Sequence, residues 1–580
     1  MKQTALRFIA MCLAMLMVLT ACGPATTDTT PTQQPTEQLA ASTPTNPAGN
    51  PTDPTNPTDP VTPTEPSEPT EPTEPTESTT APTYVAFADM EYSRQDADEL
   101  DNYYQIVLDS IEAEDDVDTL LEKIHEFYDA YCNYYTGYAL ANIYYSKDLT
   151  DSYWEEEYNY FMDTSSDVDA IFDQMLHDLA KCPLADALEE DEFFGEGFFD
   201  DYQGESIWDE TFTALMAREA ELLAQYYQIS GDAVNVAPGT ELYYNTYGSQ
   251  MADVFVEMIK VRQQIAEYAG YPDYASFAYD FTYGRDYTPD QAAKLMADIK
   301  TYITPLYISF NYNEVVAIAN KSVNSTQALA YVKSCAQSMG GVMMDAYNAM
   351  RSAGLYDITP SSKKYNASFE IFIHNYGVPY VFVNPTQKSQ DKLTFVHEFG
   401  HFANDFASNG SSVGIDVAEF FSQGLEFLSL RYSNGGGELT KLQIFSSLSV
   451  YVEQSLYATF EQRVYELKGD ELTKENVYKV FEDVAREFGF GNLDGRMFVQ
   501  VPHFFMSPMY IISYVVSNDL AVQLYQVELA ERGAGVTLYL ENLDTTEGQL
   551  LGFAASAGLE SPFADGRMAT VRDTFSEALR

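Results

Sequence analysis

A proline-rich stretch limits how much of this 580-residue chain can fold. Residues 23–83 consist mainly of Pro, Thr and Glu, as in "PTEPSEPTEPTEPTESTT", and contain few apolar side chains. Such a composition cannot bury enough apolar surface to offset the entropy lost on ordering, and dense proline favours extended polyproline II. We therefore expect a disordered, semi-rigid stalk at 23–83, and a folded part at 84–580 that is long enough for two lobes.

The segment before the stalk has the pattern of an export signal. Lys2 and Arg7 accompany an apolar run at 8–19, which is too short to span a membrane and typical of a signal peptide. The run leads into "LTACG", which resembles a bacterial lipobox. We predict a lipoprotein signal peptide at 1–22, lipidation of Cys22, and an extracytoplasmic location on the bacterial cell membrane. The alternative is an ordinary signal peptide cut nearby, with Cys22 incidental.

Charge and cysteine usage exclude two kinds of site. The chain has 88 Asp and Glu against 31 Lys and Arg, a formal net charge of -57 at pH 7. Phosphate binding needs a basic surface, so we expect no nucleic-acid partner. Beyond the signal segment only Cys132, Cys182 and Cys335 remain, an odd number with wide spacing. This pattern fits neither a disulfide framework nor a cysteine-based zinc site.

The folded part reads as mostly helical. From about residue 92 to 229, apolar residues recur at three-and-four spacing without strand alternation. The pattern breaks at "GDAVNVAPGTELYYNTYGSQ" and then resumes, which predicts an N-terminal helical lobe at 84–235 and a catalytic domain at 236–580. Residues 367–385 alternate with a period of two around "NYG", which predicts a small hairpin.

Two of the six histidines lie four residues apart in "HEFGH", directly after the hairpin. On a helix His397 and His401 share one face, so both imidazoles can bind one ion. Glu398 points beside that face, where it can reach a metal-bound water. Zinc lowers the pKa of such a water, and a carboxylate can take its proton during attack on a peptide carbonyl.

A catalytic zinc needs a third protein ligand and an open position. The metzincin pattern would need glycine at 404 and histidine at 407, but Asn404 and Ala407 stand there. The following segment "DVAEFFSQGLEFLSLRY" offers carboxylates instead: Glu419, Glu426 and, as a weaker candidate, Asp416. The two glutamates are about 10 Å apart along a helix, so only one of them can bind the same ion.

"HEFGH" followed by "VAEFFSQGLEF" resembles the oligoendopeptidase F and thimet oligopeptidase family of zinc peptidases. The resemblance implies that Glu419 is the third ligand, with Ser422 and Gln423 beside it, and that the chain binds one Zn2+. The stretches "NASFEIFIHNYGVPYVFVNP", "YASFAYDFTYGRDYTPDQ" and "SAGLESPF" are also similar to family segments, so the resemblance spans about 236–575. The N-terminal lobe matches only in being helical and Tyr-rich.

The segment "VPHFFMSPMYIISYVVSNDLA" is similar to a family stretch in which a histidine precedes a tyrosine cluster. The resemblance implies that His503, Tyr510 and Tyr514 polarise the scissile carbonyl and stabilise the oxyanion opposite the zinc. Donors placed where charge develops supply much of the electrostatic stabilisation in such reactions. The spacing departs slightly from the family pattern, which leaves open which tyrosine donates.

The resemblance implies two helical lobes around a deep substrate channel, with a small β-sheet next to the HExxH helix. It also implies a zinc-dependent oligoendopeptidase that hydrolyses short, flexible peptides by attack of a zinc-bound water, with Glu398 as general base. The predicted lipid anchor would place this reaction outside the cell, and we expect a monomer. One alternative is a catalytically inactive peptide-binding lipoprotein of the same fold, and another is a carboxypeptidase of the same clan. The intact HExxH, the third glutamate and His503 argue against the inactive binder.

Overall fold

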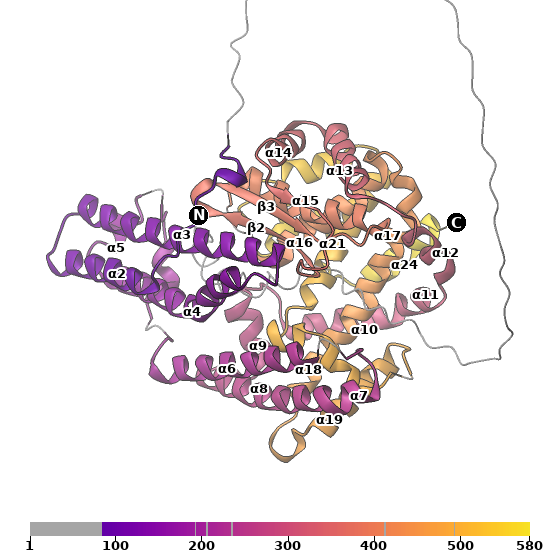
Figure 1. Cartoon of the computed structure of the whole chain (residues 1–580), viewed down its shortest axis with the longest axis horizontal. Helices are drawn as coiled ribbons and strands as arrows, with labels where there is room; N and C mark the ends of the chain where they lie inside the picture. The colour runs from indigo at the N-terminus through magenta and orange to yellow at the C-terminus, as the bar shows by residue number, and fades with distance from the viewer. Residues whose placement is uncertain are drawn as a thin grey trace, which may run out of the picture. The chain divides into compact units, whose positions relative to one another are not determined.

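A computed structural model describes residues 84–579, apart from 192, 205–206, 234–235, 411–412 and 492. These residues belong to one compact unit, Tyr84–Arg580 (Figure 1). The predicted signal peptide, the lipidation site Cys22 and the predicted stalk lie outside the described residues. Within the described part, no helix combines the length and the apolar character needed to cross a membrane.

Helices make up most of the described residues. Before the sheet they are α2 (Ala97–Glu112), α3 (Val117–Lys147), α4 (Ser152–Lys181), α5 (Ala185–Leu188), α6 (Glu210–Ala233), α7 (Glu241–Tyr243), α8 (Ser249–Tyr268), α9 (Tyr274–Phe277), α10 (Pro289–Tyr302), α11 (Thr304–Ile308), α12 (Tyr312–Ala319), α13 (Ser325–Met339) and α14 (Gly341–Ser352). After it they are α15 (Gln390–Ser408), α16 (Ile415–Tyr432), α17 (Thr440–Ser449), α18 (Ser455–Val464), α19 (Lys474–Glu487), α20 (His503–Met506), α21 (Ile512–Ala530), α22 (Ala534–Glu541), α23 (Leu550–Ser556) and α24 (Arg567–Ala578).

The three helices α2, α3 and α4 pack against one another in the N-terminal part (Figure 1). Each begins after an aspartate whose carboxylate accepts a backbone N–H of the first turn: Asp96, Asp116 and Asp151. Buried tyrosines fill the space between them, and the hydroxyls of Tyr131 and Tyr135 both donate to the carboxylate of Asp169. The Tyr-rich sequence of this part therefore forms a core of rings with their hydroxyls hydrogen-bonded.

The predicted boundary between two domains falls at residues 234–235, which lie outside the described residues. The helices that flank it, α6 and α8, pack side by side (Figure 1). The division into 84–235 and 236–580 stays a prediction.

The predicted hairpin is present and belongs to a sheet of three described strands. Strand β2 (Ser368–Ile373) pairs antiparallel with β3 (Val378–Val383), through a turn that ends at Gly377 with φ +58°. Glycine adopts this left-handed conformation without steric cost. A short strand that the sequence does not predict, β1 (Tyr356–Asp357), pairs parallel with β3, so the order is β1-β3-β2 and β2 is an edge strand.

Helix α15 packs on β2 and β3 and, on its other sides, on α13, α14 and α16. Helix α16 in turn packs closely on α21, which is buried along most of its length. The HExxH helix is therefore held between the sheet and a central helix pair. The predicted fold class, mostly α with a small β-sheet next to this helix, is confirmed.

Candidate metal centre and active site

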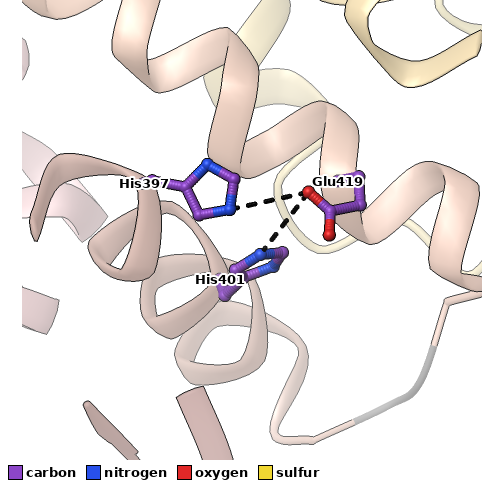
Figure 2. A group of neighbouring side chains, drawn as sticks. All are labelled: His397, His401 and Glu419. Atoms are coloured by element: carbon purple, nitrogen blue, oxygen red, sulfur yellow. Dashed lines mark ion pairs between the residues drawn. The ribbon is translucent and has the colours of Figure 1, made fainter. Parts of the chain in front are cut away.

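Hydrogen bonds to Asp391 fix the N-terminus of α15, the helix that carries the HExxH motif. Asp391, in its first turn, accepts the backbone N–H groups of Thr386 at 2.9 Å and of Lys388 at 3.1 Å. These bonds tie the connection after β3 to the helix. One turn apart on the same helix, His397 and His401 present their rings to the same side, with ring centroids 5.1 Å apart (Figure 2).

A close approach of two helices brings the third ligand to the histidines. A Cβ added at Gly400 would lie 2.6 Å from the carbonyl oxygen of Phe421 and 2.6 Å from the Cα of Ser422, both on α16. No side chain larger than hydrogen fits there without moving a backbone. The glycine of "HEFGH" therefore allows α15 and α16 to pack at the distance that the site needs.

His397, His401 and Glu419 form a group of three potential metal ligands (Figure 2). Glu419 Oε2 lies 3.6 Å from His397 Nε2 and 4.0 Å from His401 Nε2. Ligand atoms on a tetrahedral zinc ion would be about 3.4 Å apart, given bonds of about 2.1 Å. The separations are slightly wider, and small side-chain rotations would close them around an ion.

Two further side chains orient these ligands. Glu426 Oε1 lies 2.7 Å from His397 Nδ1, which leaves Nε2 of the ring directed toward Glu419. The Ser422 hydroxyl donates to Glu419 Oε2 at 3.2 Å, and also to the Glu419 carbonyl one turn back. A carboxylate on the second nitrogen of a histidine is the usual support of a metal-binding imidazole.

Buried polar atoms without partners indicate that something polar belongs in the site. Among the described residues, His401 Nε2 and both carboxylate oxygens of Glu398 are buried without a hydrogen-bond partner. Leaving such groups unsatisfied is costly, so native structures seldom do so without reason. A cation next to the imidazole nitrogens, with a water beside Glu398, would satisfy all three atoms. The donor set of two imidazoles and one carboxylate suits zinc.

Burial and neighbouring charges shift the pKa values of the site residues. Burial lowers the pKa of His397, but its hydrogen bond with Glu426 and the charge of Glu419 outweigh this and raise the pKa to about 9. Burial, opposed by the charge of His397 and reinforced by Glu419, raises the pKa of Glu398 to about 8. Burial together with the charge of His397 holds the pKa of His401 well below its usual range. The carboxyl groups of Glu398, Glu419 and Glu426 and the two imidazoles therefore interact strongly in a buried setting, where a bound cation would be stabilised.

The second predicted half of the site lies against the ligand Glu419. The Tyr510 hydroxyl donates to Glu419 Oε1 at 3.4 Å. His503 Nε2 lies 3.4 Å from the Tyr514 hydroxyl, and the rings of Tyr510 and Tyr514 are 5.1 Å apart. The structure therefore brings all seven predicted site residues of the folded part together. Their roles in catalysis stay predictions.

The structure also shows what the other candidate ligands and the residue at 404 contact. Glu426 contacts the outer nitrogen of His397, and Glu419 is the carboxylate in the ligand group. Asp416 lies outside that group, with Oδ2 3.7 Å from Arg285 Nε. Asn404 donates to the carbonyl of Leu543 at 2.8 Å, which gives it a structural role in the core.

Sequence reasoning missed two contributions to the site. It treated Glu426 as a rival ligand, although a second glutamate two turns along the same helix was the available signal for a supporting partner. It also gave no role to Arg285, which is fully buried and contacts the backbone at Tyr510. The segment around Arg285 resembles the family, but nothing local shows the role of this side chain, because Met509 and Ser513, which it contacts, lie more than 220 residues away in the chain.

The N-terminal part of the chain matches a known family model. Residues 87–205 match the family model described as the peptidase M3 N-terminal domain. These residues include α2, α3 and α4. The resemblance to the family thus extends into the N-terminal lobe, where the sequence motifs matched the family only in helicity and tyrosine content. Among curated proteins, the sequence comparison finds no match.

Solved structures share the fold along the described part. A protein assigned as oligoendopeptidase F is similar at a TM-score of 0.75 and 18% identity, covering 85% of this chain and 98% of that chain. PZ peptidase A with an inhibitor is similar at 0.74 and 17%, covering 85% and 99%. A protein assigned as oligoendopeptidase F from Bacillus anthracis is similar at 0.70 and 19%, covering 85% and 98%.

At these identities the likeness of the structures shows the fold. Together with the match of the N-terminal family model, it confirms the resemblance to the oligoendopeptidase F and M3 peptidase family that the sequence motifs predict.

Proposed function

We propose that this chain is a zinc-dependent oligoendopeptidase that hydrolyses short, flexible peptides outside the cell. The observation that carries the proposal is the group His397, His401 and Glu419, with the unpartnered carboxylate of Glu398 beside it and the hydroxyl of Tyr510 against the third ligand. The peptidase fold of the described part supports a peptide substrate.

His397, His401 and Glu419 would hold one Zn2+, with Glu426 and Ser422 orienting two of them. When bound, the zinc supplies Lewis acidity, which polarises a peptide carbonyl, lowers the pKa of water and favours the carboxylate form of Glu398. The three ligands leave a position open for water or substrate, as catalytic sites require.

Glu398 is the general base of the proposed reaction. Its two oxygens are fully buried and have no hydrogen-bond partner among the described residues, so they are available to an attacking water. The carboxylate takes a proton from that water and passes it to the leaving amine. Burial raises the pKa of this carboxyl and the bound zinc would lower it, and these opposing effects suit a group that first accepts a proton and then returns it.

Tyr510, with His503 and Tyr514 beside it, supplies the donors for the oxyanion. Donors in a buried site act strongly because little solvent competes with them. The Tyr510 hydroxyl donates directly to Glu419, the third member of the proposed ligand group, and the Tyr514 hydroxyl lies beside His503. We therefore assign the direct role to Tyr510.

The substrate backbone would lie along β2, the edge strand of the sheet on which α15 packs. An edge strand offers unpaired backbone groups to an extended peptide. A channel between two helical lobes would admit flexible peptides and exclude folded proteins. We further propose a monomer anchored by a lipid on Cys22, with 23–83 as the stalk that holds the enzyme away from the membrane.

The test is cleavage of an internally quenched peptide by the full chain purified in detergent. We expect cleavage by the wild type that a chelator abolishes and added zinc restores, and a loss of about 10²- to 10⁴-fold in Glu398→Gln with its zinc retained. Zinc binding without cleavage by the wild type would favour the inactive peptide-binding alternative. Product masses decide the other alternative, since release of single C-terminal residues would indicate a carboxypeptidase.

The location has a separate test. Labelling of producing cells with a fatty-acid analogue is expected to mark the wild type, which should partition with membranes. Cys22→Ser is expected to abolish both the fatty-acid label and the partitioning with membranes. Labelling that survives the substitution would contradict the anchor at Cys22.

A further inference from the structure

The turn that leads into Tyr510 contains an uncommon backbone conformation. Met509 has φ +63°, in the left-handed region, and its side chain is buried. Glycine and asparagine adopt this conformation readily, whereas methionine does so only where surrounding groups enforce it. Because Met509 directly precedes Tyr510, its φ and ψ set the direction in which Tyr510 leaves the turn.

Two buried side chains, a carboxyl group and a guanidinium, hold both backbone polar groups of Met509. Its N–H donates to Glu461 Oε1 at 2.8 Å, and its carbonyl accepts from Arg285 Nη1 at 3.0 Å. Glu461 lies on α18 and Arg285 lies between the π-helical turn η4 (Ala278–Thr282) and α10. Both side chains are almost fully shielded from solvent, so these bonds face little competition from water.

The rest of the turn is held in the same manner. Arg262 donates to the carbonyls of Phe504 and Phe505 at 2.9 and 2.5 Å, and the Tyr283 hydroxyl donates to the carbonyl of Pro508 at 2.9 Å. Side chains from distant segments therefore replace the regular hydrogen bonds that the irregular turn cannot make. Such a turn keeps its shape only while these partners remain in place.

Arg285 also contacts the metal half of the site. Its Nε lies 3.7 Å from Asp416 Oδ2, and Asp416 stands three residues before Glu419 on α16. Its Nη2 donates to the Ser513 hydroxyl at 2.7 Å on α21. One guanidinium thus links the helix of the ligand carboxylate to the turn of the tyrosine that contacts this carboxylate.

We propose that Arg285 and Glu461 are positioning residues, which hold Met509 in its left-handed conformation and so fix the Tyr510 hydroxyl within reach of Glu419. The inference rests on the proposed function and deepens it. The competing view is that both residues only stabilise the fold, as the buried pair of Arg567 and Asp519 does elsewhere.

The kinetic test is a double-mutant cycle in the full chain. Arg285→Lys keeps a positive charge beside Asp416 but loses the fork of donors, so no buried carboxylate is left without a cation. Tyr510→Phe is expected to lower kcat about 100-fold in the wild type and less than about 3-fold in Arg285→Lys, with KM nearly unchanged. Arg567→Lys is the matched control, and in this background Tyr510→Phe should still lower kcat about 100-fold.

If Tyr510→Phe lowers kcat as much in Arg285→Lys as it does in the wild type and in Arg567→Lys, the positioning role is overturned. If the wild type itself cleaves no peptide, the proposed function fails, and a second measurement then decides the inference alone. Hydrogen exchange of the segment around Met509 is expected to be faster in Glu461→Leu than in the wild type. Glu461→Gln keeps an acceptor oxygen and is expected to restore the protection. Unchanged exchange in Glu461→Leu would overturn the inference without reference to activity.

Discussion

The two halves of the candidate site are built in contrasting ways. The metal half, with His397, His401 and Glu419, lies on two regular helices whose spacing is fixed by one glycine contact. The oxyanion half lies around an irregular turn, whose backbone is held by buried side chains from α8, α18 and the segment before α10. The first half is local in sequence, whereas the second depends on contacts across more than 200 residues.

This difference explains why the two halves should respond differently to substitution. A helix pair keeps its ligands in register through many backbone hydrogen bonds, so loss of one side chain removes one function. An irregular turn has few bonds of its own, so loss of one distant partner should displace several groups at once. The predictions below test this contrast, first through zinc binding and the reaction and then through stability.

Loss of a ligand should have the largest effect. Glu419→Gln is expected to lower bound zinc to a small fraction of one ion per chain and to reduce cleavage to the level of the chelated wild type, because the carboxylate charge is removed from the ion. Metal analysis of the purified chain beside the cleavage assay measures both. Full zinc occupancy in this variant would exclude Glu419 as a ligand.

The two tyrosines should differ in their effect on the reaction. Tyr510→Phe is expected to lower kcat by about 10²-fold, as removal of one oxyanion donor does elsewhere. Tyr514→Phe, which loses the contact of this hydroxyl with His503, is expected to lower kcat by less than about 10-fold. Steady-state kinetics at saturating zinc measures both variants. The reverse order would assign the donor role to Tyr514.

The support behind His397 should affect metal affinity more than chemistry. Glu426→Gln is expected to weaken zinc binding by about 10- to 100-fold, with kcat at saturating zinc close to that of the wild type. Competition with a chelator of known affinity measures this. Glu438→Gln, at an exposed glutamate on the surface, is the control and should bind zinc as the wild type does. Equal affinities in the two variants would contradict the supporting role.

The helix contact at Gly400 should appear mainly as a loss of stability. A Cβ at this position meets the α16 backbone at 2.6 Å, so Gly400→Ala is expected to cost about 1–3 kcal/mol of unfolding free energy. Gly437→Ala is the matched control, because its Cβ would meet nothing within 4 Å. Chemical denaturation of both variants provides the measurement, and equal midpoints would show that the helices can separate without cost.

The last prediction concerns the pH dependence of stability. Burial raises the pKa of Glu461 from its usual 4.5 to about 8 in the folded protein. The folded state then binds this proton more tightly than the unfolded state, so the stability it contributes is present below about pH 4.5 and is lost as the pH rises through about 8. Glu461→Gln is expected to reduce the fall in melting temperature over this range. An unchanged slope would contradict a raised pKa at Glu461.

Much of the fold could be predicted from the sequence, because its signals are local. Three-and-four spacing marks the long helices, and alternation around "NYG" marks the pairing of β2 with β3. Strand β1 was missed, because two residues carry no recognisable period and pair through a contact between segments far apart in the chain.

Local sequence patterns and the family resemblance were enough to predict the residues of the candidate metal half. Four-residue spacing on one helix puts His397 and His401 on the same face whatever the surroundings, and the resemblance singled out Glu419 on the next helix. The contacts of Glu426 with His397 and of Tyr510 with Glu419 are visible only in the folded structure. The physical reason is the range of the contacts. Helix periodicity acts within a few residues, whereas the turn before Tyr510 takes its shape from Arg285 and Glu461, which only folding brings to it.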